Sequence, residues 1–388
     1  MKWMISEDRL GSDQREVIDE VGKISTKPIW IQGYAGSGKS VLLLHSLKDY
    51  LAQKPTSKVC VVVFTRALVD LIKIGITQIP FLEGKVIPVF TIYEFRNHLT
   101  NKFDAIFCDE IQDLPLDFIK QMRSACNHLV IAGDSVQSIY ATVPEFNTSP
   151  ANPSEILAAI QPIEKKLKVI YRLTTSVISV LKNVFSEMLA ERPVIGAVDT
   201  EIKLFNSKSE KEEISYVWFD AKETNELRTS EIIAILLYGR KPIIEFVNCV
   251  LELEKKPLWT PVNNSFGSPD FGKMNSHLAM NNIPLMLEGN RYGSLNDAAN
   301  QNKIVLMTYH SSKGLDFDYV YLPLVGNEMW LHSSVPINAL LLVALSRSKS
   351  GLTITYSGEM YKNFRPFLKT ITARPIPEIG LESDEVIF

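Results

Sequence analysis

The sequence has few cysteines and no long apolar run. Its four cysteines, Cys60, Cys108, Cys126 and Cys249, form no CxxC pair, so no disulfide framework is expected. The longest apolar run, from Ala339 to Leu345, is far shorter than the ~18 residues that a membrane span needs. The first residues also lack the apolar segment of a signal peptide. These absences predict a cytoplasmic, reduced chain with no membrane partner.

Basic residues are not in excess either. The 41 Lys and Arg residues face 44 Asp and Glu residues, which gives a formal net charge of −3, and the pI is about 6.1. Proteins that bind nucleic acid through bulk electrostatics usually carry a basic excess. Any contact with nucleic acid must therefore be confined to a local groove in which positive charge is concentrated.

What the chain does have is the length and the pattern of an α/β protein. Its 388 residues, 46% of them hydrophobic, are enough for two domains with a core each. Short β-branched runs alternate with helical patterns, which is typical of parallel sheets. Loop signals cluster between Val143 and Pro153, and the alternation restarts after Tyr171. We expect domains at 1–173 and 174–388.

The expected elements follow the apolar runs. Helical spacing places Leu43, Leu44, Leu47 and Leu51 on one face of a helix. In the second half of the chain, helices are expected over 223–238 and 337–347. Strands are expected at 28–32, 59–64, 86–90, 103–108, 129–133, 167–171, 202–205, 218–220, 243–247, 303–308, 319–322 and 352–356.

A glycine-rich loop near the N-terminus is typical of phosphate binding. The segment GYAGSGKS, from Gly33 to Ser40, fits the pattern GxxxxGK[ST] between an expected strand and an expected helix. In that context backbone N–H groups and the helix N-terminus bind phosphates. Lys39 is expected at the β- and γ-phosphates and Ser40 on Mg²⁺. The expected cofactors are ATP and Mg²⁺, and the binding residues are Gly33, Gly36, Ser37, Gly38, Lys39 and Ser40. A glycine-rich turn that only enters a helix is the alternative.

Another strand ends in adjacent acids. In FDAIFCDEIQD, Asp109 and Glu110 follow an apolar run. The end of such a strand lies beside the phosphate loop, where Asp109 can ligate Mg²⁺. Glu110 is then placed to deprotonate the attacking water as a general base. An acidic surface turn is the alternative, and the presence of the phosphate loop argues against it.

Together these motifs resemble those of superfamily 1 helicases of the UvrD/Rep type, in matching order from Gln14 to Lys349. The resemblance implies two RecA-like P-loop domains with parallel sheets and an ATP site in the cleft between them. It also implies an ATP-dependent translocase or helicase on single-stranded nucleic acid. The segment KGLD at 313–316 resembles the DNA enzymes of the family more than the RNA enzymes.

The resemblance assigns roles to further residues of the first domain. It implies that Gln14 reads the adenine edge, although an ordinary polar residue on a helix is the alternative. In IAGDSVQSIY, Gln137 would sense the γ-phosphate. Tyr171 would stack on adenine, and Arg172 would meet the γ-phosphate. The implied nucleic-acid contacts of this domain are Phe64, Thr65, Arg66, Thr91 and Tyr140.

In the second domain, MTYHSSKGLDFD resembles the segment that links nucleic acid to the nucleotide. Thr308 and His310 would face nucleic acid, although a lone histidine is more often structural. Gly314 and Asp316 would lie near the ribose, with Asp316 in place of the family's usual glutamate. VALSRSKSGL resembles the last motif, in which Arg347 is an arginine finger at the γ-phosphate. The alternative for Arg347 is a solvated cation at a helix C-terminus.

The chain also departs from the family. Val41 replaces a common arginine, and no aromatic residue follows Tyr140 directly, which removes a stacking contact of about 1–3 kcal/mol per base. The connections 95–104 and 290–302 are too short for the accessory domains of larger relatives. We therefore expect a better translocase than helicase. Two alternatives stay open: an ATP-gated switch that acts only with a partner protein supplying the missing surface, and a P-loop kinase for a small molecule.

Overall fold

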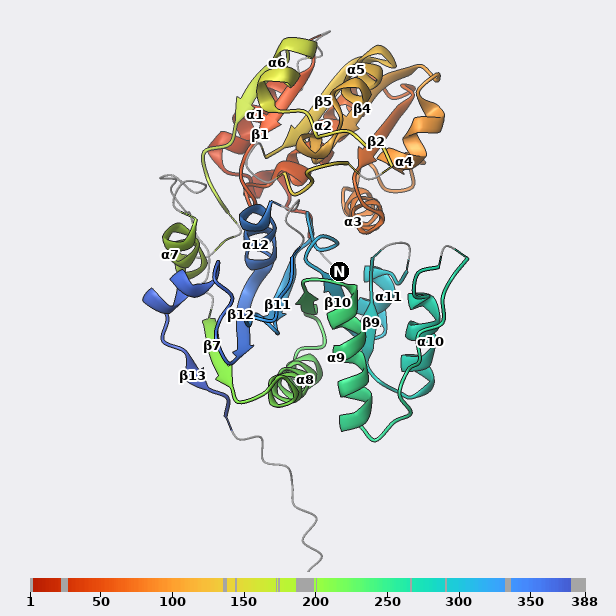
Figure 1. Cartoon of the computed structure of the whole chain (residues 1–388). Coiled ribbons are helices and arrows are strands. Elements are labelled where there is room, and N and C mark those ends of the chain that lie inside the picture. Colours follow the sequence, from red (N-terminus) through yellow and green to blue (C-terminus); the bar gives the residue numbers. More distant parts are fainter. Residues whose placement is uncertain are drawn as a thin grey trace, which may run out of the picture.

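Two parallel sheets organise the molecule. The computed structural model describes residues 3–21, 27–134, 138–143, 145–171, 173, 175–185, 199, 201–265, 267–289, 292–331 and 336–377. Figure 1 shows one sheet in the upper half of the molecule and the other in the lower half, each with helices packed around it. The α/β fold with two parallel-sheet units is therefore confirmed. Below, "upper half" means β1–β6 with their helices, and "lower half" means β7–β13 with theirs.

The upper sheet has six strands in the order β3-β2-β4-β5-β1-β6, and all its neighbouring pairs are parallel. In β2, the run VCVVV is buried at every position, as expected for a strand covered on both faces. The strands are β1 (Ile29–Gln32), β2 (Val59–Val63), β3 (Val89–Thr91), β4 (Phe103–Cys108), β5 (Cys126–Gly133) and β6 (Ile163–Lys166).

Local sequence explains where the upper helices begin. Gly38, with φ at 89°, turns the chain into α2, and the Thr65 hydroxyl caps α3 by accepting a hydrogen bond from the Leu68 N–H at 3.3 Å. The expected apolar face of α2 is buried. The helices are η1 (Glu7–Arg9), α1 (Ser12–Val21), α2 (Lys39–Gln53), α3 (Arg66–Thr77), α4 (Ile92–Phe95), η2 (Arg96–His98), η3 (Ile111–Asp113), α5 (Leu116–Ser124) and α6 (Pro153–Ile160).

The lower sheet has seven strands in the order β13-β7-β12-β11-β8-β10-β9, also parallel throughout. Its strands are β7 (Glu201–Ser207), β8 (Ile233–Leu237), β9 (Leu285–Leu287), β10 (Ile304–Thr308), β11 (Phe317–Leu322), β12 (Ser348–Ser357) and β13 (Arg374–Pro375). Its helices are α7 (Thr175–Val184), α8 (Glu210–Leu227), α9 (Arg240–Leu253), α10 (Phe271–Met280), α11 (Leu295–Asn300), α12 (Ile337–Leu345) and η4 (Arg365–Lys369).

The expected order of elements is wrong at the start of the lower half. The expected strands 218–220 and 243–247 lie inside α8 and α9. The expected helix 223–238 instead contains the end of α8 and all of β8. The reason is that β8 is a central strand between β10 and β11, so its run IAILL is buried on both faces and shows no strand alternation.

The strand expected at 167–171 is also wrong, because the last upper strand is β6. This edge strand has the sequence IEKK and exposes alternate residues, so it carries no apolar run. The segment after it, 167–171, instead lies alongside the end of β1 and the phosphate loop and forms hydrogen bonds with them. The Leu167 N–H donates to the Gln32 carbonyl at 2.8 Å, and the Tyr171 N–H donates to the Gly36 carbonyl at 2.8 Å.

The connection between β3 and β4 is short, as expected from the sequence. Residues 92–102, between β3 and β4, form only α4, η2 and a turn. Helix α7 contacts β7, α12 and η4; the boundary expected between residues 173 and 174 stays a prediction. All four cysteines are free, and Cys60 and Cys108 are buried as expected.

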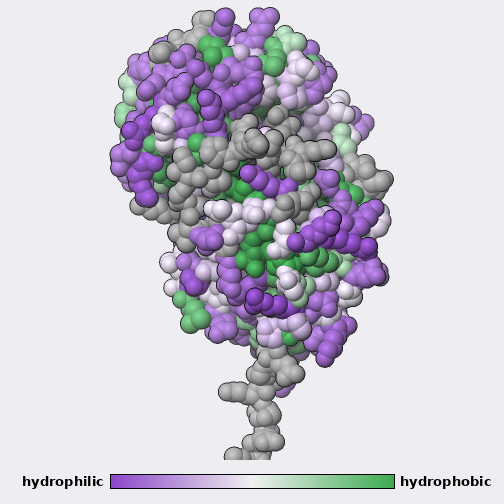
Figure 2. Space-filling view, turned by 90° about the vertical axis from the view of Figure 1, so that its left-hand side faces the viewer, coloured by the Kyte–Doolittle hydropathy of each residue, from purple (hydrophilic) through white to green (hydrophobic). Residues whose placement is uncertain are grey.

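One face of the molecule differs in polarity between the two halves. Figure 2, which views the left-hand side of Figure 1, shows hydrophilic residues over most of the upper half and a hydrophobic area on the lower half. Among the described residues, no helix is both long and apolar enough to cross a membrane. The cytoplasmic location stays a prediction.

Candidate nucleotide site and nucleic-acid groove

The loop from Gly33 to Ser40 connects β1 to α2 and requires its glycines. Gly36 and Gly38 have φ of 77° and 89°, a left-handed conformation that costs other residues free energy. A Cβ at Gly33 would lie 2.4 Å from Ser37 Oγ. The loop therefore has the compact shape that presents backbone N–H groups to an anion.

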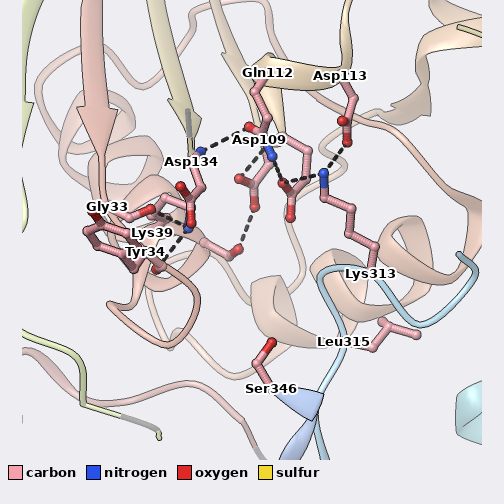
Figure 3. Close-up of polar contacts among 12 residues, drawn as sticks. Gly33, Tyr34, Lys39, Asp109, Gln112, Asp113, Asp134, Lys313, Leu315 and Ser346 are labelled. Carbon is pink, nitrogen blue, oxygen red and sulfur yellow. Dashed lines mark hydrogen bonds and ion pairs between the residues drawn. The ribbon is translucent and has the colours of Figure 1, made fainter. Parts of the chain in front are cut away.

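Three side chains complete the loop. Lys39 Nζ donates to the Gly33 carbonyl at 2.9 Å and the Tyr34 carbonyl at 3.1 Å, so it lies folded over the loop (Figure 3). Ser37 Oγ is buried without a hydrogen-bond partner, which leaves it free for a ligand. Gln14, 3% exposed, donates from Nε2 to the Ser37 carbonyl at 2.9 Å. This buried contact with the phosphate loop does not fit the alternative that Gln14 is an ordinary polar residue on a helix. The expected contact of Gln14 with adenine stays a prediction.

Ser40 and Asp109 form the pair that fits a divalent cation. The Ser40 hydroxyl donates to Asp109 Oδ2, and Asp109 is only 1% exposed at the end of β4. Burial, together with the charge of Glu110, raises the pKa of Asp109 to about 6. A buried carboxylate beside a hydroxyl offers the hard oxygen ligands that Mg²⁺ prefers. Ser40 and Asp109 could therefore hold Mg²⁺, and their expected role as its ligands stays a prediction.

The Glu110 carboxylate accepts a hydrogen bond from Gln112 and lies near the Lys313 ammonium. The Glu110 backbone has a left-handed φ of 55°, and Gln112 Nε2 donates to Glu110 Oε2. Gln112 Oε1 in turn accepts from the Asp134 N–H at 3.0 Å. Burial opposes ionisation, but the Lys313 ammonium and further nearby cations hold the pKa of Glu110 below its usual value. Glu110 is 8% exposed, so the alternative of an acidic surface turn is wrong.

Lys313 comes from the lower half, and its contact with the acids was not expected from the sequence. Its Nζ lies 2.5 Å from Asp113 Oδ2 and 3.8 Å from Glu110 Oε2, and Figure 3 shows it pointing at Asp113. Burial raises the pKa of Asp113 to about 6 although the Lys313 charge acts in the opposite direction. The available signal was the third acid of DEIQD, because a buried carboxylate needs a cation or several donors.

Tyr171 lies beside the loop and the start of α1. Its hydroxyl donates to Asp13 Oδ1, and its backbone N–H donates to the Gly36 carbonyl at 2.8 Å. A Cβ at Gly11 would lie 1.8 Å from the Tyr171 hydroxyl oxygen. The ring is therefore fixed next to Gln14 and the phosphate loop, where adenine stacking was expected.

Gly314, next to Lys313, also brings the lower half close to Glu110. Its φ is 78°, and a Cβ there would lie 2.7 Å from Leu68 Cδ2 and 3.2 Å from Glu110 Oε1. Asp316 is half-buried two residues further on. The segment expected at the ribose thus reaches the upper half at Glu110.

Arg347 is buried in the lower half. It is 2% exposed, so the alternative of a solvated cation is wrong. Its guanidinium donates to the Val343 carbonyl at 2.7 Å, the Leu315 carbonyl at 2.9 Å and Ser346 Oγ at 2.8 Å. Its charge acts on the Glu110 pKa, which places it near the acids. The arginine-finger role stays a prediction.

A groove of about 1000 Å³ separates the two halves beside this site. Phe64 stacks on Tyr140 with ring centroids 4.7 Å apart and planes at 24°, and the His310 ring lies 6.1 Å from Tyr140. Burial lowers the pKa of His310, which favours the neutral ring. Every residue expected to contact nucleic acid lines this one groove: Phe64, Thr65, Arg66, Thr91, Tyr140, Thr308 and His310.

Two family models match the sequence. The viral superfamily 1 RNA helicase core domain matches residues 29–234, which is more than half of the chain. The chain belongs to the superfamily 1 helicases. The UvrD-like helicase C-terminal domain matches residues 270–359 of the same chain. This second match supports the UvrD/Rep subtype, which stays a prediction.

This superfamily 1 helicase is similar in fold to a solved viral helicase. The crystal structure of an arterivirus nonstructural protein 10 (helicase) is similar at 12% identity with a TM-score of 0.42. The match covers 92% of this chain and 64% of that one. The present chain thus spans less than two thirds of that helicase. No curated protein matches the sequence.

Two charged residues of the groove, Glu94 and Arg240, were not expected from the sequence. Arg66 forms an ion pair with Glu94, and Glu94 Oε2 accepts hydrogen bonds from the Thr91 N–H at 2.9 Å and the Thr91 hydroxyl at 3.1 Å. Arg240, the first residue of α9, lines the groove from the lower half. Thr308 Oγ1 donates to Ser311 Oγ at 3.0 Å. Gln137 and Arg172 lie outside the described residues, so their expected roles stay predictions.

Proposed function

We propose that this superfamily 1 helicase is an ATP-dependent motor that translocates along single-stranded nucleic acid, DNA rather than RNA. One observation carries the proposal: the segment 308–316 of the lower half joins the groove to the acids. At one end Thr308 and His310 line the groove. At the other end Lys313 and Gly314 approach Glu110. A strand in the groove and a nucleotide at the loop would therefore act on the same segment.

The nucleotide chemistry follows from the upper-half residues. The loop N–H groups and Lys39 would bind the β- and γ-phosphates, and Ser40 with Asp109 would hold Mg²⁺. When bound, the ion supplies positive charge at the phosphate oxygens. Glu110 would orient the attacking water and accept its proton at a carboxylate oxygen. Arg347, on the opposite half, would add charge stabilisation only when the two halves close.

The groove suits a single strand. The half-buried Tyr140, which stacks on the buried Phe64, offers aromatic surface to the groove, and base stacking on such a ring contributes about 1–3 kcal/mol per base. A confined groove also agrees with the formal net charge of −3. The preference for DNA rests on the segment KGLD at 313–316, which resembles the DNA enzymes of the family, although the longer family match is to an RNA helicase core domain. The kinase alternative leaves the groove and the second sheet without a role.

The test is steady-state hydrolysis of ATP with Mg²⁺, alone and with single-stranded DNA or RNA of the same sequence. We expect strong stimulation by DNA, weaker stimulation by RNA, and no turnover by Glu110→Gln despite retained binding of an ATP analogue. Glu254→Gln, which removes an ion pair to Lys222 in the lower half, is the matched control and should behave like the parent. An ATP hydrolysis rate that neither single-stranded DNA nor RNA changes would contradict the motor function. Equal stimulation by DNA and RNA would contradict the preference for DNA.

A further inference from the structure

We propose that Lys313 is a positioning residue for Glu110, supplied by the lower half and effective only while the two halves are closed. The inference deepens the proposed function and rests on it. Within the nucleotide site, Lys313 would fix the general base from across the cleft. Closure of the groove and assembly of the site would then be one event.

The contact is built into the interior. Lys313 is 3% exposed and Asp113 fully buried, and their ion pair joins residues 200 positions apart in the chain. Removing one member of a buried ion pair leaves the other charge uncompensated, which is strongly unfavourable. Asp113 therefore anchors the ammonium, and at 3.8 Å from Oε2 the ammonium limits how the Glu110 carboxylate can turn.

Glu110 has few other restraints on the side of the cleft. Gln112 holds Oε2 from within the upper half, and the Gln112 amide is itself fixed by the Asp134 N–H. Lys313 acts on the same Oε2 from the lower half. Without the ammonium, the carboxylate would keep only the intradomain restraint, and a misplacement of about 1 Å can cost about 100-fold in rate.

The turn that carries Lys313 also borders the groove. Its hydrogen bonds make it compact: the Ser312 N–H donates to the Thr308 carbonyl at 3.1 Å, and the Ser312 hydroxyl donates to the Tyr309 carbonyl at 2.9 Å. His310 of the same turn lines the groove. A strand bound against His310 would therefore restrain the same turn and hold Lys313 against Asp113 and Glu110, which predicts that Lys313 transmits the nucleic-acid stimulation.

The experiment compares Lys313→Met, Lys313→Arg and Asp113→Asn in the full chain. For Lys313→Met we expect kcat for ATP to fall about 100-fold, with KM unchanged within about 2-fold and the stimulation by single-stranded DNA lost. Lys313→Arg should restore part of kcat because it keeps the charge. Lys211→Met is the matched control: its Nζ lies 3.0 Å from Glu252 Oε1 in an exposed ion pair of the lower half, and its kinetics should equal those of the parent.

The outcomes separate this inference from the proposed function. Parental kcat and stimulation in Lys313→Met would refute the positioning role and leave the motor intact. A parent protein without ATP hydrolysis would refute both. If Lys313→Met does not fold, Asp113→Asn decides, because it removes the anchor and keeps the ammonium. A lower kcat with unchanged KM then supports the role, and an unchanged kcat refutes it.

Discussion

Gly314 offers the sharpest test of how closely the two halves approach. It has a left-handed φ of 78°, and an added Cβ would meet Leu68 Cδ2 at 2.7 Å and Glu110 Oε1 at 3.2 Å. Leu68 is 1% exposed, so its side chain has little room to move. Gly314→Ala should therefore both strain the backbone and push the halves apart.

The magnitude divides into two parts that a control can separate. Alanine at a left-handed φ costs about 1 kcal/mol, and overpacking a tight contact adds about 1–3 kcal/mol. Gly358 has a similar φ of 63° with no atom within 4 Å of an added Cβ. Gly358→Ala should therefore show the backbone cost alone, and Gly314→Ala should exceed it.

The assay is urea unfolding of both variants, combined with ATP hydrolysis. We expect Gly314→Ala to lose more unfolding free energy than Gly358→Ala and to lose turnover as well. In a Leu68→Ala background, the extra cost of Gly314→Ala should disappear because its main clash is gone. Equal losses for the two glycines, with parental turnover, would show that the halves do not meet at Gly314.

Three further predictions follow from single features. Burial raises the pKa of Glu213 from 4.5 to about 7. Because the folded state therefore holds this proton more tightly than the unfolded chain does, the free energy of unfolding should fall by about 3 kcal/mol as the pH rises from about 4.5 to about 7. Glu213→Gln should remove that slope in urea titrations, and an unchanged slope would contradict the assignment. Arg347→Ala should lower the turnover rate by up to about 10³–10⁵-fold and the ATP affinity much less. Steady-state kinetics measure both, and a turnover rate equal to that of the parent would exclude Arg347 as an arginine finger. Because each base-pair step costs about 1.4 kcal/mol to open, the isolated chain should displace strands from a tailed duplex poorly, and efficient unwinding would contradict this.

The upper-half site could be predicted from the sequence because its signals are local. Gly33 follows β1, Phe64 follows β2 and Asp109 follows β4, and each of these strands is a short apolar run. Since the carboxyl ends of parallel strands lie at one edge of the sheet, side chains that follow such runs come together. The phosphate loop, the acids and half of the groove needed no long-range information.

The rest depended on contacts that no local pattern encodes. The Lys313–Asp113 pair spans 200 residues, and the two residues meet only because the lower half packs against the upper one. The wrong assignment of strands at 218–220 and 243–247, and of a helix at 223–238, has a different cause. Tyr216, Val217 and Trp218 of α8 are buried in a row, and β8 is buried at every position. Such short buried runs do not distinguish a helix from a central strand.

The balanced charge of the chain leads to a final prediction about salt. Among the groove-lining residues that the structure describes, the basic side chains with permanent charge are Arg66 and Arg240. Arg66 is already paired with Glu94, so binding of a strand would exchange one partner for another. With at most two phosphates neutralised, the slope of log affinity against log salt should be no steeper than about −1.4 for single-stranded DNA. Fluorescence anisotropy between low and moderate salt measures this slope, and Arg240→Ala should reduce it by about half. A slope steeper than about −4 would mean that a larger basic surface outside the groove binds the strand.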